Sequence, residues 1–170
     1  QIEDTTVEEV LIKNWPGLHI EPLQAPENME VLIGWTGSPA SSPHFVSEVK
    51  RLKSDPSFYG DFLEDSHRCV EKLIHAFKTN NIKGVQKMVR QNRTIIQRMD
   101  KEATVDIETE KLKYLCDIAE KYHGASKTSG AGGGDCGITI INKDVDKEKI
   151  YDEWTKHGIK PLKFNIYHGQ

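Results

Sequence analysis

The amino-acid sequence predicts an α+β domain in which one β-sheet carries amphipathic helices on one face. Two observations lead to this fold class. Short apolar, β-branched runs lie toward both ends of the chain, and three stretches between them repeat apolar residues at the i, i+3, i+4, i+7 spacing of a helix. Such helices bury their apolar stripes most simply against a sheet. The 170 residues, 36% apolar and 29% charged, fit one globular domain.

Two strands are predicted before the first helix. Residues 18–23 (LHIEPL) and 29–35 (MEVLIGW) are apolar runs separated by QAPEN, a turn-forming segment. A loop of small residues follows at 34–42 (GWTGSPASS). Ser42 and Pro43 then fit the N-cap and the first position of a helix. The residues of this helix that face inward are expected to be Phe45, Val49 and Leu52.

Three stronger helical patterns occupy the middle of the chain. The first ends before TNN at 79–81, and the third ends at YHG, where Gly124 is the expected C-terminal stop. The expected stripes are Val70, Leu73, Ile74 and Phe77; then Ile82, Val85, Val89, Ile96 and Met99 with the polar Asn92; then Leu112, Leu115, Cys116 and Ala119.

The C-terminal part is predicted to hold a strand, a helix and a final strand. CGITIIN at 136–142 has the β-branched composition of a buried strand. Residues 145–157 fit a helix closed by Gly158. Alternating apolar residues then predict the last strand at Leu162, Phe164 and Ile166.

Charge and cysteine content limit the class of partner. A net charge of −3 and a pI near 6.2 give no overall basic field for nucleic acid or for an anionic membrane. No apolar run approaches the roughly 18 residues of a membrane span. Three widely spaced cysteines, without a CxxC pair, fit reduced thiols. We therefore expect a cytoplasmic protein without nucleic-acid or membrane partners.

A glycine-rich segment, GASKTSGAGGGDCG at 124–137, places six glycines in fourteen residues. Glycine loses more conformational freedom on folding than any other residue, so some feature must require this cluster. Gly132, Gly134 and Gly137 match G-x-G-x-x-G, but a dinucleotide site needs a strand before the motif and a helix after it. The expected context is the reverse, a helix before and a strand after, so that function is excluded.

Two explanations of the cluster stay open on the residues alone. The loop can lie tightly against another element, or its free amides, with Lys127, Thr128 and Ser129 beside them, can line an anion site. A Walker A loop is excluded, because Ser126 stands where the glycine before Lys127 and Thr128 is required.

The stretch KTSGAGGGDCG at 127–137 resembles the third conserved motif of the GHMP kinases, the superfamily of galactokinase, homoserine kinase, mevalonate kinase and phosphomevalonate kinase. With GWTGSPASS and VRQNRTIIQRM (89–99), it resembles the phosphomevalonate kinases over essentially the whole chain. The resemblance implies a C-terminal GHMP domain at 29–170 with an antiparallel, ferredoxin-like sheet. It also implies ATP-dependent phosphorylation of 5-phosphomevalonate to 5-diphosphomevalonate in the mevalonate pathway of isoprenoid biosynthesis.

The family's ATP phosphate loop and its catalytic aspartate and lysine would precede these motifs, and the chain has no such loop. We therefore expect the C-terminal half of the enzyme, with residues 1–28 continuing from a missing N-terminal domain. The lack of an initial methionine agrees with this. ATP and Mg²⁺ would be bound mainly by that partner half. No catalytic or metal-binding residue is assigned here, and the chain alone is expected to be inactive.

The resemblance implies two groups of site residues. The third-motif loop would close on the reacting phosphates through Lys127, Ser129, Gly130, Ala131, Gly132, Gly133 and Gly134. The acceptor would be bound by Ser38, Ser41, Ser42, Asn92 and Arg93. Alternatives stay open: Ser42 capping a helix, Arg93 in a surface ion pair and Lys127 merely solvated. Asp135 is expected to order its own loop by accepting amide hydrogen bonds.

Two further functions also stay open. One is a GHMP kinase with another acceptor, such as mevalonate. The other is a binding module that keeps the scaffold without catalysis. Turnover with each acceptor in turn separates the kinases, and calorimetric titration with phosphomevalonate tests the module.

Overall fold

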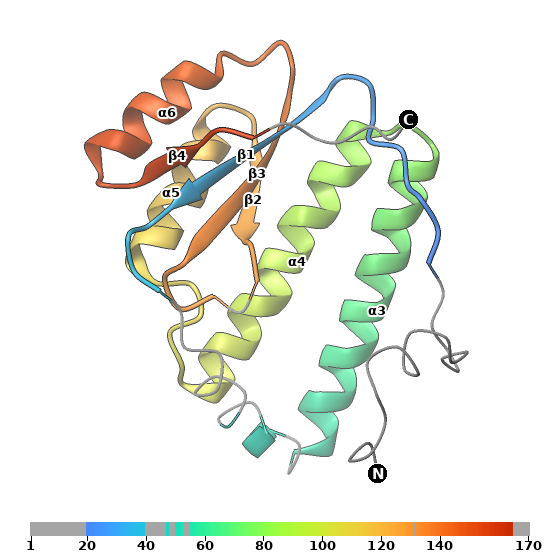
Figure 1. Ribbon diagram of the computed structural model, residues 1–170. Coiled ribbons are helices and arrows are strands. Elements are labelled where there is room, and N and C mark those ends of the chain that lie inside the picture. Colours follow the sequence, from blue (N-terminus) through green and yellow to red (C-terminus); the bar gives the residue numbers. More distant parts are fainter. Residues whose placement is uncertain (1–19, 40–46, 48–49, 53–54, 131, 165–170) are drawn as a thin grey trace, which may run out of the picture.

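The computed structural model describes residues 20–39, 47, 50–52, 55–130 and 132–164. Its core is a four-stranded antiparallel sheet in the order β2-β3-β1-β4 (Figure 1). The strands are β1 (Met29–Trp35), β2 (Ala125–Thr128), β3 (Cys136–Asn142) and β4 (Lys160–Leu162), and the helices are α3 (Pro56–Lys78), α4 (Ile82–Ala103), α5 (Glu110–Lys121) and α6 (Lys147–Lys156). With α5 before β2 and α6 before β4, this is the ferredoxin-like order that the family resemblance implied.

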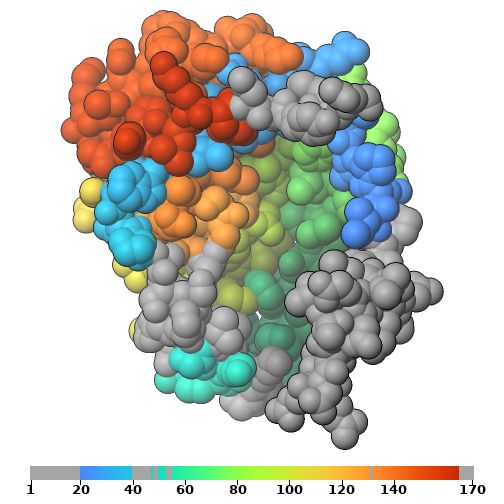
Figure 2. Space-filling model, in the orientation of Figure 1, coloured from blue at the N-terminus to red at the C-terminus, as the bar shows by residue number. Residues whose placement is uncertain are grey.

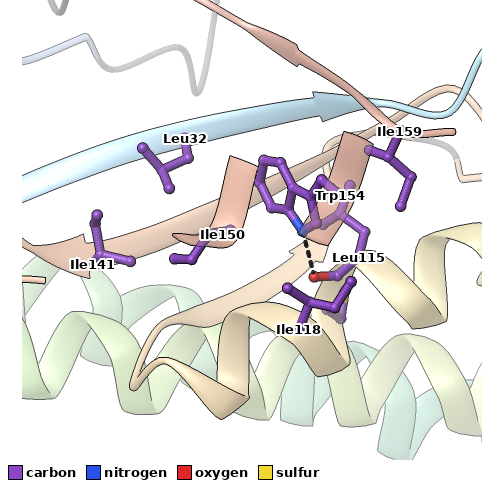
Figure 3. Packing of buried hydrophobic residues seen from close by; sticks show 8 residues of the cluster. Leu32, Leu115, Ile118, Ile141, Ile150, Trp154 and Ile159 are labelled. Carbon is purple, nitrogen blue, oxygen red and sulfur yellow. Dashed lines mark hydrogen bonds between the residues drawn. The ribbon is translucent and has the colours of Figure 1, made fainter. Parts of the chain in front are cut away.

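Helices α5 and α6 cover one face of the sheet. Leu32 of β1 and Ile141 of β3 pack there against Leu115, Ile118, Ile150, Trp154 and Ile159 (Figure 3). The indole Nε1 of Trp154 donates a hydrogen bond of 3.1 Å to the Leu115 carbonyl, which joins the two helices. This face therefore has the helix layer that the sequence predicted.

The opposite face is also covered, by α4 with α3 packed beside it (Figure 1). Val31 and Ile140, which alternate with Leu32 and Ile141 along the strands, pack against Val85 of α4 and its neighbours. The expectation of helices on one face only was therefore wrong. Consecutive apolar residues in both central strands are the signal of a sheet buried on two faces.

Three predicted elements begin or end elsewhere. Residues 20–23 form no strand, and Ile20 is 82% exposed. The last strand starts earlier than predicted, at Lys160, and Phe164 lies beyond it. Residues 47 and 50–52 are helical, as predicted for that region, with Leu52 half-buried. Residues 18, 19, 43, 45, 49 and 166 lie outside the described residues.

The helical stripes were predicted with local errors. On α3 the buried residues are Cys69 and Ala76, whereas Val70 is 45% exposed. On α4 Ile95 is buried and Ile96 only half-buried. Most of the other predictions are confirmed. On α3, Leu73 and Phe77 pack against the core. The predicted residues Ile82, Val85, Val89 and Met99 of α4 are buried, and so are Leu112, Leu115, Cys116 and Ala119 of α5. The errors fall where two apolar residues are neighbours in the sequence, since either one could face the core.

The C-terminal ends of α5 and α6 test the prediction that a glycine terminates each helix. Gly158 has φ +68° and closes α6, as predicted. After α5, however, the left-handed residue is His123, with φ +61°, and not Gly124. Gly124 instead donates its N–H to the Ala119 carbonyl at 2.8 Å, the long bond of a Schellman motif. A Cβ on Gly124 would lie 3.0 Å from that carbonyl oxygen, so close packing explains this glycine.

No helix within the described ranges is long and apolar enough to cross a membrane. The three cysteines are free, and Cys69 and Cys116 are buried. Burial raises the pKa of the Cys116 thiol to about 11, and the positive charge of Arg93 offsets only part of that effect. An exposed thiol has a pKa near 9.0, so the pKa of Cys116 is higher in the folded chain than in the unfolded chain.

The free energy of unfolding is therefore expected to fall as the pH rises from about 9 to about 11. Below this window the Cys116 thiol is protonated in both states and contributes no pH dependence. Inside it, only the unfolded chain releases the proton, which favours unfolding by up to about 2–3 kcal/mol. Urea titrations of the wild type and Cys116→Ala on both sides of the window measure the effect. Identical pH dependence in the two proteins would contradict it.

Candidate functional site

Two loops of small residues meet at one end of the β1–β3 pair (Figure 1). The Thr36 N–H donates to the Asp135 carbonyl at 2.9 Å, and a Cβ on Gly134 would lie 3.5 Å from the Cβ of Ser38. In Figure 2 the residues that follow β1, in cyan, lie beside the orange surface of the β2–β3 hairpin. We call this surface, made of the described parts of residues 36–38 and 129–135, the loop junction.

The glycine-rich segment connects two strands of a hairpin. Lys127 and Thr128 belong to β2, and the Ser129 N–H donates to the Cys136 carbonyl at 2.9 Å to close the turn. The expectation that a helix directly precedes the glycines was wrong, because the four-residue strand ASKT intervenes. Since a strand and not a helix follows the motif, its exclusion as a dinucleotide site holds.

Three consecutive glycines have left-handed backbone. Gly132, Gly133 and Gly134 have φ of +78°, +75° and +114°. The Gly133 N–H donates to the Ile107 carbonyl at 2.8 Å, and a Cβ on Gly132 would lie 2.4 Å from that oxygen. Backbone conformation and contact with Ile107 are therefore sufficient reasons for Gly132 and Gly133.

Gly130 differs from the other glycines of the loop. It has no positive φ, and a Cβ built on it would have no atom within 4 Å. Packing among the described residues therefore gives no reason for glycine at this position. Ala131 lies outside the described residues.

Lys127 is half-buried on the side of β2 that faces α4. Its Nζ donates to the Thr128 carbonyl at 2.6 Å, and no carboxylate of the described residues forms an ion pair with it. Burial lowers the pKa of Lys127. The alternative of a fully solvated lysine therefore does not hold, and the side chain is a partly desolvated cation next to the loop junction.

The loop at 34–42 carries hydroxyl groups that the sequence analysis assigned to acceptor binding and one, on Thr36, that it did not. Ser38 is exposed at the loop junction, while Ser41 and Ser42 lie outside the described residues. Thr36 is 1% exposed, and its Oγ1 has no hydrogen-bond partner among the described residues. Lys111 Nζ donates to the Thr36 carbonyl at 3.0 Å. The sequence analysis singled out neither Thr36 nor Lys111. Thr36 belongs to the small-residue loop at 34–42, but nothing in the sequence indicated Lys111.

Asp135 orders the loop through its backbone and not through its carboxylate. Its carbonyl accepts the Thr36 N–H, while its exposed carboxylate accepts, among the described residues, only the Cys136 thiol, at 3.7 Å. The predicted hydrogen bonds from loop amides to the carboxylate are therefore not formed in the described residues.

Arg93 forms an ion pair inside the chain. Its Nε and Nη2 donate to the two carboxylate oxygens of Glu108 at 2.8 and 2.6 Å, and Nη2 also reaches Asp117 at 3.1 Å. The side chains of Arg93 and Glu108 are only 14% and 4% exposed. The ion-pair alternative thus accounts for Arg93, although the pair is buried and not on the surface. Asn92 is half-buried on the same helix.

Within the described residues, no group of histidine, cysteine, aspartate and glutamate side chains is arranged to hold a metal ion. The structure brings Ser38 next to the glycine loop at Gly134, and Lys127 lies in the strand that leads into that loop. Such donors and cations suit an anionic ligand.

Comparison with known proteins identifies the family of this domain. Residues 73–160 match the GHMP kinases C terminal family. The chain is 34% identical over 159 residues to the phosphomevalonate kinase of a Streptomyces strain, which covers 92% of this chain and 42% of that protein.

Two solved structures have the same fold over nearly the whole chain. A Listeria innocua protein superposes with a TM-score of 0.86 and 36% identity, covering 96% of this chain and 46% of that one. Streptococcus pneumoniae phosphomevalonate kinase in complex with phosphomevalonate and AMPPNP gives a TM-score of 0.77 and 27% identity, covering 95% and 46%. The chain thus spans less than half the length of these relatives. Its sequence and its fold show that it belongs to the GHMP kinases, as their C-terminal domain.

Proposed function

We propose that this chain is the C-terminal half of a phosphomevalonate kinase, which transfers a phosphoryl group from ATP to 5-phosphomevalonate. The observation that carries the proposal is the similarity to the Streptomyces phosphomevalonate kinase across 92% of the chain. The S. pneumoniae structure supports the substrates, since that relative binds phosphomevalonate and an ATP analogue. In this proposal, residues 29–170 form the C-terminal domain and residues 1–28 connect it to the rest of the enzyme.

The loop junction is the part of the chain that we assign to phosphate binding. Phosphoryl transfer depends mainly on positioning and on neutralising charge at the reacting oxygens. The unobstructed backbone at Gly130 can approach such oxygens, and the partly desolvated Lys127 provides a positive charge close by. Ser38, exposed next to Gly134, supplies a hydroxyl donor for the acceptor.

Mg-ATP, which supplies the transferred phosphoryl group, would be held mainly by the N-terminal half, as the family resemblance implies. This chain contributes the surface that closes on the phosphates. We therefore expect the 170 residues alone to show no turnover, and the complete enzyme to be needed for the assay.

Steady-state assays of ADP release by the complete enzyme test the proposal. We expect turnover with 5-phosphomevalonate and little with mevalonate. Preference for mevalonate would identify a mevalonate kinase instead. No turnover with either acceptor, together with calorimetric binding of phosphomevalonate, would identify a binding module on the same scaffold.

A further inference from the structure

Helix α4 holds the connection to α5 with side chains that lie on one face. Arg93, Gln97 and Asp100 are spaced at i, i+4 and i+7, so they project from the same side of the helix. Arg93 and Gln97 both donate to the carboxylate of Glu108, Gln97 through Nε2 at 3.1 Å. This carboxylate is almost completely buried, so its position is fixed by those donors.

Asp100 fixes the backbone of the same connection. Its Oδ1 accepts the Ile107 N–H at 2.9 Å, and its Oδ2 accepts the Glu108 N–H at 3.1 Å. Two consecutive amides are thus bound by one carboxylate, an arrangement of charge-assisted hydrogen bonds that is stronger than the neutral kind. It determines the direction in which the Ile107 carbonyl points.

Ile107 is in turn the surface on which the glycine loop rests. Ile107 is 5% exposed, and its carbonyl accepts the Gly133 N–H. A Cβ built on Gly132 would lie 2.3 Å from the Ile107 Cγ2 and 2.4 Å from its carbonyl oxygen, which leaves no room for a side chain there. A continuous series of contacts therefore runs from α4 through Ile107 to the glycine loop.

We propose that Asp100 is a positioning residue for the glycine loop. By holding the Ile107 and Glu108 amides, it sets the place of the carbonyl to which Gly133 bonds, and so the approach of the loop backbone to its ligand. Its effect on turnover rests on the proposed function, but its effect on the loop does not. The sequence gives no hint of this role, because Asp100 lies far from the glycine loop along the chain.

Hydrogen–deuterium exchange of the complete protein tests the proposal with Asp100→Asn, which keeps the shape but removes one acceptor oxygen. We expect exchange of the amides at 129–135 to rise about tenfold, while β1 and α6 keep wild-type protection. Asp106→Asn, in the same connection but without these hydrogen bonds, is the matched control and should leave the loop unchanged. Gln97→Leu, which removes only the bond to Glu108, is a milder second variant with a smaller expected rise.

Two results would overturn the proposal. In one, exchange rises at 105–109 but not at 129–135, so that Ile107 does not transmit the change. In the other, exchange rises equally throughout the chain, which indicates general loss of stability. Kinetics of the same variant separate this proposal from the proposed function. A fall in kcat with little change in the KM for ATP supports both, whereas a mobile loop with unchanged kcat supports the positioning role and contradicts the catalytic one.

Discussion

Gly130→Ala is expected to lower kcat of the complete enzyme by about a hundredfold without changing its thermal stability. A new Cβ at this position meets no atom of the described residues within 4 Å, so no clash there opposes folding. If the loop backbone donates to the transferring oxygens, the Cβ obstructs that approach, and the loss of one such donor typically costs about two orders of magnitude in kcat. Steady-state kinetics and a melting curve on one purified variant measure both quantities.

Gly132→Ala is expected to give the opposite pattern. Its left-handed backbone and the contact with Ile107 make alanine unfavourable by at least about 1 kcal/mol, so the melting temperature falls. Turnover per folded molecule should fall less than in Gly130→Ala. Gly60→Ala, at an open position on α3, is the control: kcat should be unchanged, and stability should rise by up to about 1 kcal/mol because alanine favours a helix. Unchanged kcat in Gly130→Ala would contradict a role of the Gly130 backbone in approaching the phosphates.

Arg93→Ala is expected to lower the free energy of unfolding by about 3–5 kcal/mol. The substitution leaves the carboxylate of Glu108, 4% exposed, with Gln97 as the remaining side-chain donor among the described residues. An uncompensated buried charge is costly because the protein interior solvates it poorly. Urea denaturation followed by circular dichroism measures the loss.

Arg98→Ala is the matched control for this substitution. Arg98 pairs with Asp65 between α4 and α3, but its side chain is 49% exposed, so its removal should cost at most about 1 kcal/mol. A double variant that also replaces the buried carboxylate, Arg93→Met with Glu108→Leu, should recover much of the loss. Equal losses in Arg93→Ala and Arg98→Ala would contradict the assignment of a buried pair.

Contact between Arg93 and an anionic group of the acceptor stays a prediction. In Arg93→Lys the charge is kept but the bidentate geometry is lost. A rise in the KM for the acceptor that exceeds the rise for ATP would support such a contact in addition to the ion pair.

The sequence predicted the elements whose signals are local. Strands β1 and β3 have the predicted bounds because their apolar runs contain several strand-favouring residues and are flanked by turn-forming segments. Strand β2 was missed because ASKT is short and merges with the glycines that follow it. The second helix layer was missed although consecutive apolar residues in β1 and β3 indicated burial on both faces. They do not say which helix covers each face.

In the candidate site, too, features set by neighbouring residues could be predicted from the sequence, whereas contacts between distant segments could not. A cluster of glycines, visible in the sequence, correctly marked an unusual backbone at 132–134. Each glycine can be explained by tight packing or by an anion site. The structure favours packing where the loop contacts Ile107, a residue that only the tertiary fold brings close. The partners of Arg93 were hidden for the same reason, since Glu108 and Asp117 lie beyond the end of its own helix.

The strand order also determines which strands form the edges of the sheet, and therefore how readily the domain can aggregate through them. Strands β2 and β4 are its edges, and an open edge invites pairing with another polypeptide and hence aggregation. Strand β4 has only three described residues, and among them Pro161 has no amide hydrogen to donate while Lys160 adds an exposed charge. Strand β2 is nearly as short and lies against both α4 and α5. Neither edge therefore offers a neighbouring chain a long row of unpaired backbone groups.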